Sequence, residues 1–470
     1  MEHHLRSHLA KRLDAFACHS HGLILLLICS LLSIFCSAAV AGSIGINYGR
    51  VANNLPSPRQ AVQLMQSCSL RKVKLYDADA RVLRALAYTQ MEVIIGFPNE
   101  QVYSIARKPS LARKWIKRNV AKHIRATNIT AISVGNEVLT STRGITKLLL
   151  PAMRNLHDAL VALNLESQVK LSTPHALNVL SNSFPPSAGA FRPDIATSVM
   201  KPLLDFLSQT GSFVMINAYP YFAYRANPAV ISLDYTLFRP NAGVKDPQTG
   251  LVYTNLLDAQ LDAVFAAMAS LGHKDLRIVV TETGWPSKGD PTETGVSVSN
   301  AAAYNGNLIN HITTSNGTPM KPGVPVDVFI FALFNEDLKP GPESERNYGL
   351  FYPDQSMVYD VGMQKTKSPA IGNKPQLQQS SWCVAKPGVS KSSLQAALDY
   401  ACGLGKADCS RIQVGQTCFD PNTLVDHASY AFNSYYQKNQ KQTGTCDFGG
   451  TAMVVQQDPS EYTKCAYPQN

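Results

Sequence analysis

Eight short runs of apolar, mostly β-branched residues recur between residues 43 and 334, and longer segments separate them. The runs cover 43–48, 72–76, 92–97, 131–138, 169–174, 213–219, 277–282 and 326–334. Several intervening segments, at 111–125, 143–163 and 255–270, have the amphipathic period of helices. Continuously apolar strands that alternate with helices are typical of a parallel sheet that is covered on both faces.

Eight strand–helix units predict the α/β class, as a (β/α)8 TIM barrel, with a doubly wound open sheet as the alternative. The count of eight and the lack of a Gly-rich turn after the first strand both favour the barrel. After about residue 360 the alternation stops, and residues 365–381 are rich in Lys, Gln, Ser and Pro without any periodicity. This composition indicates a linker, so a chain of 470 residues is predicted to hold two domains.

The first forty residues resemble a targeting segment rather than part of the fold. An apolar run at 23–35 follows Arg6, Lys11 and Arg12, and Ala39-Val40-Ala41 fits a signal-peptidase site. A transmembrane anchor is the alternative, but the run is short for a membrane span. The last residues of the chain lack the hydrophobic tail that announces a glycolipid anchor. We therefore predict a signal peptide at 1–41 and a secreted, extracellular protein without stable membrane insertion.

Cysteines crowd the end of the chain. Six of them, Cys383, Cys402, Cys409, Cys418, Cys446 and Cys465, lie within fewer than a hundred residues. In a secreted chain this density predicts a small disulfide-rich domain, although sequence alone leaves fifteen pairings open. Zinc is the alternative, but the segment has no C-x-x-C or H-x-x-x-H pair. Cys68 has no second cysteine nearby and is predicted to be a buried, structural thiol.

The charge and the sequons complete the picture of an extracellular protein. The formal net charge is +10, but the basic residues look scattered, without a Lys/Arg block. We therefore expect no nucleic-acid partner and attribute the charge to attraction by a polyanionic matrix. Asn128 and Asn316 begin acceptor sequons for N-glycosylation.

The catalytic residues of a (β/α)8 barrel lie at the carboxyl ends of its strands. In this chain those positions hold mainly carboxylates and aromatic residues: Tyr48, Tyr76, Asp77, Asp79, Asn136, Glu137, His175, Tyr219, Tyr221, Phe222, Glu282, Trp285, Phe334 and Glu336. They include no serine nucleophile beside a base, no cluster of metal ligands and no phosphate loop. Glu137 and Glu282 follow the fourth and seventh strands, and two carboxyl groups with aromatic walls are what glycosidic hydrolysis needs. Asp77, Asp79 and His175 are expected to have structural roles.

The motifs around these glutamates resemble glycoside hydrolase family 17, the plant β-1,3-glucanases. The resemblance covers nearly all of 43–360 and rests on Gly135-Asn136-Glu137, Thr281-Glu282-Thr283-Gly284-Trp285-Pro286-Ser287, Gly45-Ile46-Asn47-Tyr48-Gly49, Lys74-Leu75-Tyr76-Asp77-Ala78-Asp79, Asn217-Ala218-Tyr219-Pro220-Tyr221-Phe222 and 331–353. The cysteine-rich segment, which opens Trp382-Cys383-Val384, resembles the X8 domain, a carbohydrate-binding module of family 43. We predict a catalytic domain at 42–361, a linker at 362–380 and this mainly helical module at 381–467.

The resemblance implies a role for each matching residue. Glu137 would be the general acid/base and Glu282 the nucleophile of a retaining, two-step mechanism, with Tyr219 orienting Glu282. Glu336, Lys339 and Glu345 match a conserved charged group that tunes protonation. The substrate-binding residues would be Tyr48, Tyr76, Asn136, Tyr219, Phe222, Trp285 and Phe334. The family pattern also implies the disulfides Cys383–Cys446, Cys402–Cys409 and Cys418–Cys465.

The resemblance therefore implies a secreted endo-hydrolase of β-1,3-glucan, a glucan endo-1,3-β-D-glucosidase, that needs no cofactor and no metal and acts as a monomer. A β-1,3-1,4-glucanase or a transglycosylase on the same scaffold remains open, because cleft shape decides between these activities. A non-catalytic wall protein that only binds glucan is disfavoured, since both glutamates are present. A retaining mechanism predicts that the two carboxyl groups lie about 5–5.5 Å apart.

Overall fold

The computed structural model describes residues 41–140, 144–315, 317–363, 381–386, 388–439, 445–455, 458–462 and 465–468. These residues form two compact units, each with its own hydrophobic core. Asn316, the linker at 364–380 and residues 1–40 of the predicted signal peptide lie outside the described residues. In the part of the chain that is described, no helix has the length and apolar character needed to cross a membrane.

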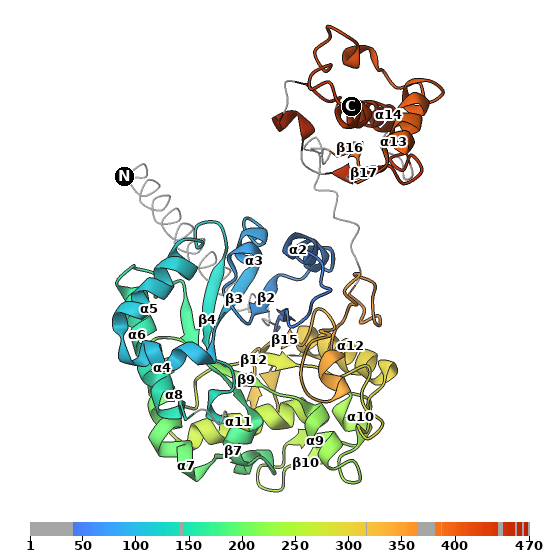
Figure 1. The fold of residues 1–470 in the computed structure, drawn as a ribbon. Helices are drawn as coiled ribbons and strands as arrows, with labels where there is room; N and C mark the ends of the chain where they lie inside the picture. Colours follow the sequence, from blue (N-terminus) through green and yellow to red (C-terminus); the bar gives the residue numbers. More distant parts are fainter. Residues whose placement is uncertain are drawn as a thin grey trace, which may run out of the picture. The chain divides into compact units, whose positions relative to one another are not determined.

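The first unit is a parallel barrel ringed by helices, as predicted (Figure 1). Its strands are β1 (Ile44–Tyr48), β2 (Lys72–Leu75), β3 (Glu92–Phe97), β4 (Ile129–Val134), β5 (Lys170–Ser172), β6 (Pro174–Ala176), β9 (Val214–Asn217), β12 (Ile278–Thr283) and β15 (Asp327–Ile330). They pair in the order β5-β4-β3-β2-β1-β15-β12-β9-β6. The two ends of this order, β5 and β6, are separated only by Thr173 and together make the predicted fifth strand. The nine strands thus occupy the eight predicted positions of the barrel.

Helices follow the strands around the barrel. The main ones are α2 (Pro58–Ser67), α3 (Ala80–Ala85), α4 (Asn99–Arg107), α5 (Pro109–Ile116), α6 (Leu149–Val161), α8 (Lys201–Gln209), α9 (Pro220–Ala226), α11 (Leu256–Ser270) and α12 (Val298–Thr314). A π-helical segment, η1 (Lys117–Ala121), continues α5. Side-chain caps begin several of these helices: Ser57 forms a capping box with Gln60 on α2, and Asn255 caps α11.

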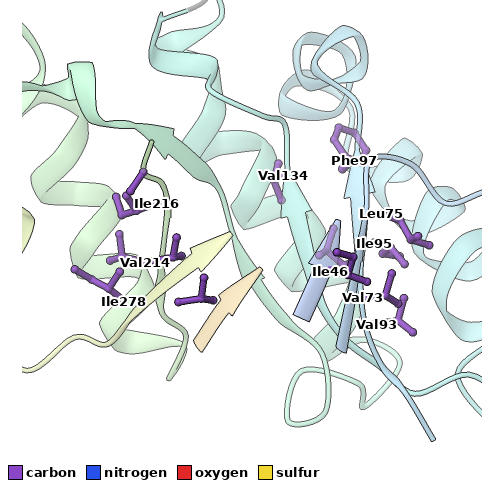
Figure 2. Packing of buried hydrophobic residues seen from close by; sticks show 14 of the residues in the cluster. Ile46, Val73, Leu75, Val93, Ile95, Phe97, Val134, Val214, Ile216 and Ile278 are labelled. Atoms are coloured by element: carbon purple, nitrogen blue, oxygen red, sulfur yellow. The ribbon is translucent and has the colours of Figure 1, made fainter. Parts of the chain in front are cut away.

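Alternate strand residues belong to two different cores. Ile46, Val73, Val93, Val214 and Ile278 belong to a large cluster that also contains the apolar faces of the helices (Figure 2). The residues next to some of them form a separate cluster without helical members: Ile94, Ala131, Met215, Val279 and Phe329. This second set therefore fills the barrel interior, as the two-residue period of a strand requires. Lys74 lies between Val73 and Leu75, so it belongs to the interior face of β2.

Two predicted strand ends were wrong. β4 stops at Val134, not at 138, because Gly135 (φ 68°) and Glu137 (φ 51°) both adopt left-handed backbone conformations that a strand cannot contain. β15 stops at Ile330, four residues before the predicted end, and a cis peptide joins Phe331 to Ala332. Glu137 and Phe334 consequently lie on loops beyond their strands.

The second unit is the small disulfide-rich module. It consists of an antiparallel strand pair, β16 (Trp382–Ala385) and β17 (Ala452–Val455), and two helices, α13 (Lys391–Cys402) and α14 (Leu424–Lys438). α14 packs on β16, and α13 packs on α14. It contains the three disulfides that the resemblance implied, Cys383–Cys446, Cys402–Cys409 and Cys418–Cys465. In the barrel unit, Cys68 is buried in the main core, and Asn128 is exposed.

Candidate active site

Glu282 lies near the carboxyl end of β12, and side chains from two other parts of the barrel hold both of its carboxylate oxygens. The ammonium group of Lys74, on β2, donates a hydrogen bond of 2.7 Å to Oε1. The hydroxyl of Tyr219, just after β9, donates one of 3.0 Å to Oε2. Because Lys74 is fully buried and Glu282 is only 6 % exposed, the two residues form a buried ion pair.

This ion pair decides the charge of Glu282. Burial alone would raise the pKa of this carboxyl, but the opposing contributions, of which the charge and hydrogen bond of Lys74 are the largest, hold the pKa below its usual value. The charge of Lys339 acts in the same direction on this pKa. Glu282 therefore stays ionised at mildly acidic pH, which is the state that a carboxylate nucleophile requires.

Glu137 projects from the tight turn that follows β4, and hydrogen bonds fix this turn on both sides. Asn99 accepts a bond of 2.8 Å from the amide of Asn136 and donates one of 3.0 Å to its carbonyl. The amide of Glu137 donates to the carbonyl of Pro174 at 3.0 Å. Gly135 leaves no room for a larger residue, since an added Cβ would lie 2.4 Å from Val138 and 2.6 Å from Asn99.

The neighbours of Glu137 shift its pKa in the direction opposite to that of Glu282. Burial, followed by the negative charge of Glu282, raises the pKa of Glu137. The side-chain amide of Asn217 donates a hydrogen bond of 2.9 Å to Oε1 and offsets part of this rise. Two carboxyl groups whose pKa values are displaced in opposite directions are the usual mark of an acid and a nucleophile that act together.

The charged group after β15 borders this pair. Glu336 is buried, accepts a hydrogen bond of 2.7 Å from the amide of Val51, and has its pKa raised by burial. Lys339 pairs with Glu345 at 3.3 Å, and its ammonium group lies 4.2 Å from the centre of the Phe331 ring. Lys339 thus links this loop electrostatically to Glu282.

Aromatic rings lie around the two carboxylates, but only some of the predicted substrate-binding aromatic residues are among them. Tyr76 and Tyr219 pack with Phe331 and Tyr348 in one small cluster, and the Tyr76 hydroxyl donates to Asn47 at 3.0 Å. Phe222 is 43 % exposed and can offer a ring face to a ligand. Asn136, at the turn before Glu137, is partly exposed.

Three of the predicted substrate-binding aromatic residues have no ring face available for stacking on a sugar. Tyr48, Trp285 and Phe334 are 2 %, 0 % and 2 % exposed, because they pack into the main core instead of facing the cleft. The indole of Trp285 contacts the rings of Tyr221 and Tyr304, and its N–H donates to the carbonyl of Gly295 at 2.9 Å. The structure therefore corrects the assignment of these three residues: they support the cleft from behind.

A hollow of about 420 Å³ opens beside Glu137. It is lined by Glu137, Ala176, Leu177, Asn178, Ser183, Asn217, Tyr219, Phe222, Ala223 and Gln260. The lining combines one carboxyl group, several amides and an exposed aromatic ring. Such a combination suits the hydroxyl groups and apolar faces of sugar rings.

Lys74 and Asn217 were missed by reasoning from the sequence, although Lys74 carries a signal. A lysine within the apolar run Val73-Lys74-Leu75 is predicted to be buried, and a buried lysine needs a carboxylate partner. Asn217 ends the apolar run of β9, where it bonds both Glu137 and, at 2.9 Å, the hydroxyl of Thr281. An amide at a strand end, by contrast, is too common to stand out.

The other polar residues at the strand ends have structural surroundings. Asp79 caps α3 and pairs with Arg50 and Arg81, and the hydrogen bond from Arg81 helps to lower its pKa. Asp77 also pairs with Arg50, at 2.5 Å. His175 is fully buried instead of lying on the rim, and burial lowers its pKa to about 4. It is therefore neutral and shielded from a ligand.

Comparisons with known proteins identify the family of this chain. Residues 44–363 match the family described as glycosyl hydrolases family 17, and residues 381–453 match the X8 domain. The chain is 50 % identical over 438 residues to "Glucan endo-1,3-beta-glucosidase 7" of Arabidopsis thaliana, with 93 % of this chain and 86 % of the relative covered. It is 46 % identical over 450 residues to "Glucan endo-1,3-beta-D-glucosidase" of Olea europaea, with 95 % and 97 % covered.

Among solved structures, the chain is similar to CJP38, a β-1,3-glucanase and allergen of Cryptomeria japonica pollen, with a TM-score of 0.66 and 43 % identity. That match covers 68 % of this chain and 99 % of the other. A second similar structure, at 37 % identity and a TM-score of 0.62, covers 67 % of this chain and 99 % of the other and comes from a study of two plant β-glucan endohydrolases with distinct substrate specificities. The chain therefore belongs to glycosyl hydrolases family 17 and is a glycosidase with an appended X8 domain.

Proposed function

We propose that the protein is a secreted, retaining endo-hydrolase of β-1,3-glucans, with Glu137 as general acid/base and Glu282 as nucleophile. The observation that carries this proposal is the contrast between the two carboxyl groups. The pKa of Glu282 is lowered by Lys74, while the pKa of Glu137 is raised by burial and by the charge of Glu282. One group is thus ready to attack and the other to donate a proton.

The reaction follows from these states. Glu137 donates its proton to the glycosidic oxygen while an oxygen of Glu282 attacks the anomeric carbon, so the glycosidic bond breaks and a glycosyl ester forms on Glu282. Glu137, now ionised, takes a proton from water. That water attacks the anomeric carbon and releases Glu282 and a product of unchanged configuration. Tyr219 keeps Glu282 oriented throughout, because it bonds the oxygen that Lys74 leaves free.

The substrate is assigned from the relatives and from the site. Both curated relatives are named as glucan endo-1,3-β-glucosidases, and they match over most of their length. The hollow beside Glu137, with the exposed ring of Phe222, can hold glucose units on the leaving-group side. A callose-type or fungal-wall β-1,3-glucan fits these features. We propose that the X8 domain holds insoluble glucan near the barrel, and that the predicted boundaries at 361 and 381 separate the two activities.

The test is to replace each glutamate with alanine and to measure hydrolysis of laminarin. We expect Glu282→Ala and Glu137→Ala each to lose activity by several orders of magnitude, as removal of a catalytic group does in other enzymes. Asp275→Ala, which removes an exposed carboxylate on the loop before β12, is the matched control and should retain full activity. Azide should restore cleavage in Glu282→Ala and give a glycosyl azide of inverted configuration.

Two outcomes would refute parts of the proposal. Turnover at the wild-type rate in Glu282→Ala would remove the nucleophile assignment. An inverted anomer as the first product, seen by proton NMR, would remove the retaining mechanism, which needs carboxyl groups about 5–5.5 Å apart.

A second activity, on mixed-linkage β-1,3-1,4-glucan or by transglycosylation, is favoured by one observation. The similar structure at 37 % identity belongs to a pair of endohydrolases described as having distinct substrate specificities. Product analysis on laminarin and on mixed-linkage glucan, side by side, distinguishes these activities. Products longer than the laminarin oligomers supplied would identify transfer. Secretion is tested separately, because N-terminal sequencing of exported protein should begin at Gly42.

A further inference from the structure

Residues 107–125 carry an unusual concentration of positive charge. This segment runs from the end of α4 through α5 and η1 and contains no acidic residue. All of its lysines and arginines are exposed: Arg107, Lys108, Arg113, Lys114, Lys117, Arg118, Lys122 and Arg125. We call these residues the basic face. The expectation that basic residues are scattered was therefore wrong for this segment, because its eight lysines and arginines lie close together in the sequence.

The charges of the basic face are not neutralised by neighbours. Among the described residues, no salt bridge joins any member of the face to a carboxylate, whereas Arg50, Lys72, Lys74 and Arg225 elsewhere in the barrel all have such partners. The positive charges of Lys122 and Arg84, after burial, lower the pKa of His123 at the edge of the face. The local potential is consequently positive, and an anion would be attracted.

The basic face also has a shape that can receive a ligand. A shallow hollow of about 490 Å³ is lined by Ser110, Arg113, Lys114, Lys117 and Arg118. Its four cations form two pairs with the i, i+4 spacing that places side chains side by side on a helix. A second hollow, of about 510 Å³, shares Lys114 and Arg118 and adds polar and aromatic lining from Gln101, Ser104, Trp115 and Asn119. The aspartates that border it, Asp77 and Asp79, are already paired with Arg50.

We propose that the basic face binds an acidic polysaccharide, a polymer of uronate sugars whose carboxylates meet the lysines and arginines. The adjoining amides, hydroxyl groups and indole edge are groups that bind sugar hydroxyls and rings, which favours a saccharide over a nucleic acid or an anionic membrane. The three disulfides of the module indicate an oxidising compartment, where nucleic acids are scarce. Leu111 is the only large apolar side chain exposed within residues 107–125, and Tyr103 is exposed just before them, which is too little apolar surface to insert into a bilayer.

This binding would act independently of glycosidic cleavage. It would hold the enzyme on an acidic matrix by charge while the neutral glucan is cut at the barrel mouth. Binding should weaken steeply with salt, because exposed charges are screened over about 8 Å at physiological ionic strength.

The experiment measures binding of the full chain to polygalacturonate at low salt, by co-sedimentation and calorimetry. Arg113→Gln/Lys117→Gln removes two cations that line only the first hollow. Lys274→Gln/Arg277→Gln is the matched control, because it removes the same charge from exposed positions just before β12, a strand that lies well away from β3 and β4 in the order of the sheet. We expect the first variant to bind roughly tenfold more weakly than the wild type and the control to change little, as loss of direct ionic contacts predicts. Hydrolysis of soluble laminarin should be unchanged in both.

Each result has a defined meaning. Equal weakening in both variants would show that only net charge matters and would overturn the proposal. So would equal binding to fully methyl-esterified pectin, which lacks the carboxylates. Tighter binding to duplex DNA or to phosphatidylserine vesicles than to polygalacturonate would assign the face to another polyanion and equally overturn it. A change in laminarin hydrolysis would bear on the proposed function and not on this surface.

Discussion

The two glutamates of the site are held by opposite kinds of neighbour, and Glu282 is buried whereas Glu137 is partly exposed. Glu282 lies on β12, where the pairing register shifts, and meets a buried cation, Lys74. Glu137 lies on a turn with left-handed backbone and meets a neutral amide, that of Asn217. Burial raises the pKa of both carboxyls, but Lys74 makes the largest opposing contribution at Glu282, with Lys339 acting in the same direction, whereas the charge of Glu282 raises the pKa of Glu137 further. The difference teaches that the charges placed around two similar acids can divide their roles.

Lys74→Met should have the largest effect on the difference between the pKa values of Glu282 and Glu137. Without the cation, burial dominates, and the pKa of Glu282 rises. Because Glu282 must be ionised to attack, the acidic limb of the kcat/KM profile should move to higher pH. Removing one partner of a buried pair also costs about 3–5 kcal/mol of stability. We expect a loss of activity on the order of a hundredfold at the wild-type optimum.

The control for this variant lies on the same strand. Lys72 pairs with Asp327 and Glu92 at the start of β2, outside the active site. Lys72→Met should leave the acidic limb where it is in the wild type. If Lys74→Met also kept the wild-type pH profile, Lys74 would have no part in setting the charge of Glu282.

A smaller effect should come from Gly135→Ala, which strains the turn that carries Glu137. The left-handed conformation costs a residue with a side chain roughly 1–2 kcal/mol. The added methyl group would also collide with Val138 and Asn99. We expect kcat to fall by at least about tenfold, since a small displacement of a catalytic group has this effect.

Gly250→Ala separates the two causes of this loss. Gly250 has a similar φ of 76°, but nothing lies within 4 Å of an added Cβ. Thermal unfolding of both variants measures the shared cost of the backbone conformation, and kcat measures displacement of the acid. Equal kcat values in the two variants would show that the packing of the turn does not position Glu137.

The smallest loss of activity should follow from Asn217→Ala, which widens the difference between the pKa values of Glu137 and Glu282. The hydrogen bond from Asn217 lowers the pKa of Glu137, so its loss raises that pKa further. Because the acid must be protonated, the alkaline limb of kcat/KM should move to higher pH, while activity falls severalfold through loss of orientation. A shift of the acidic limb instead would mean that Asn217 acts on Glu282.

Much of the barrel could be predicted because strands buried on both faces are apolar throughout. The runs at 92–97 and 277–282 lie within one residue of β3 and β12. The end of β4 was predicted too late, because the run was extended to Val138 across Gly135-Asn136-Glu137, where the backbone turns. Both glutamates were identified through their motifs, and their catalytic roles remain proposals.

Side-chain direction was the information that the sequence lacked. Trp285 follows a strand end as a cleft residue would, yet it points into the core, because Tyr221 and Tyr304 make an apolar site for its indole. Phe222 belongs to the same group of motifs and is exposed. The packing of neighbouring elements decides that Trp285 is buried and Phe222 is exposed. This packing cannot be predicted from motif spacing or residue type.

The hydrogen bond from the amide of Glu137 to the carbonyl of Pro174 has a consequence for protein engineering. The acid is fastened to β6, where the barrel closes, and not to the strand that precedes it. The nucleophile, by contrast, brings its cation from β2. A graft of the acid onto another barrel would need the turn, Asn99 and the adjacent strands β6 and β9, which supply Pro174 and Asn217. A graft of the nucleophile would have to carry strands from different parts of the ring. The two halves of this catalytic pair are therefore not equally portable.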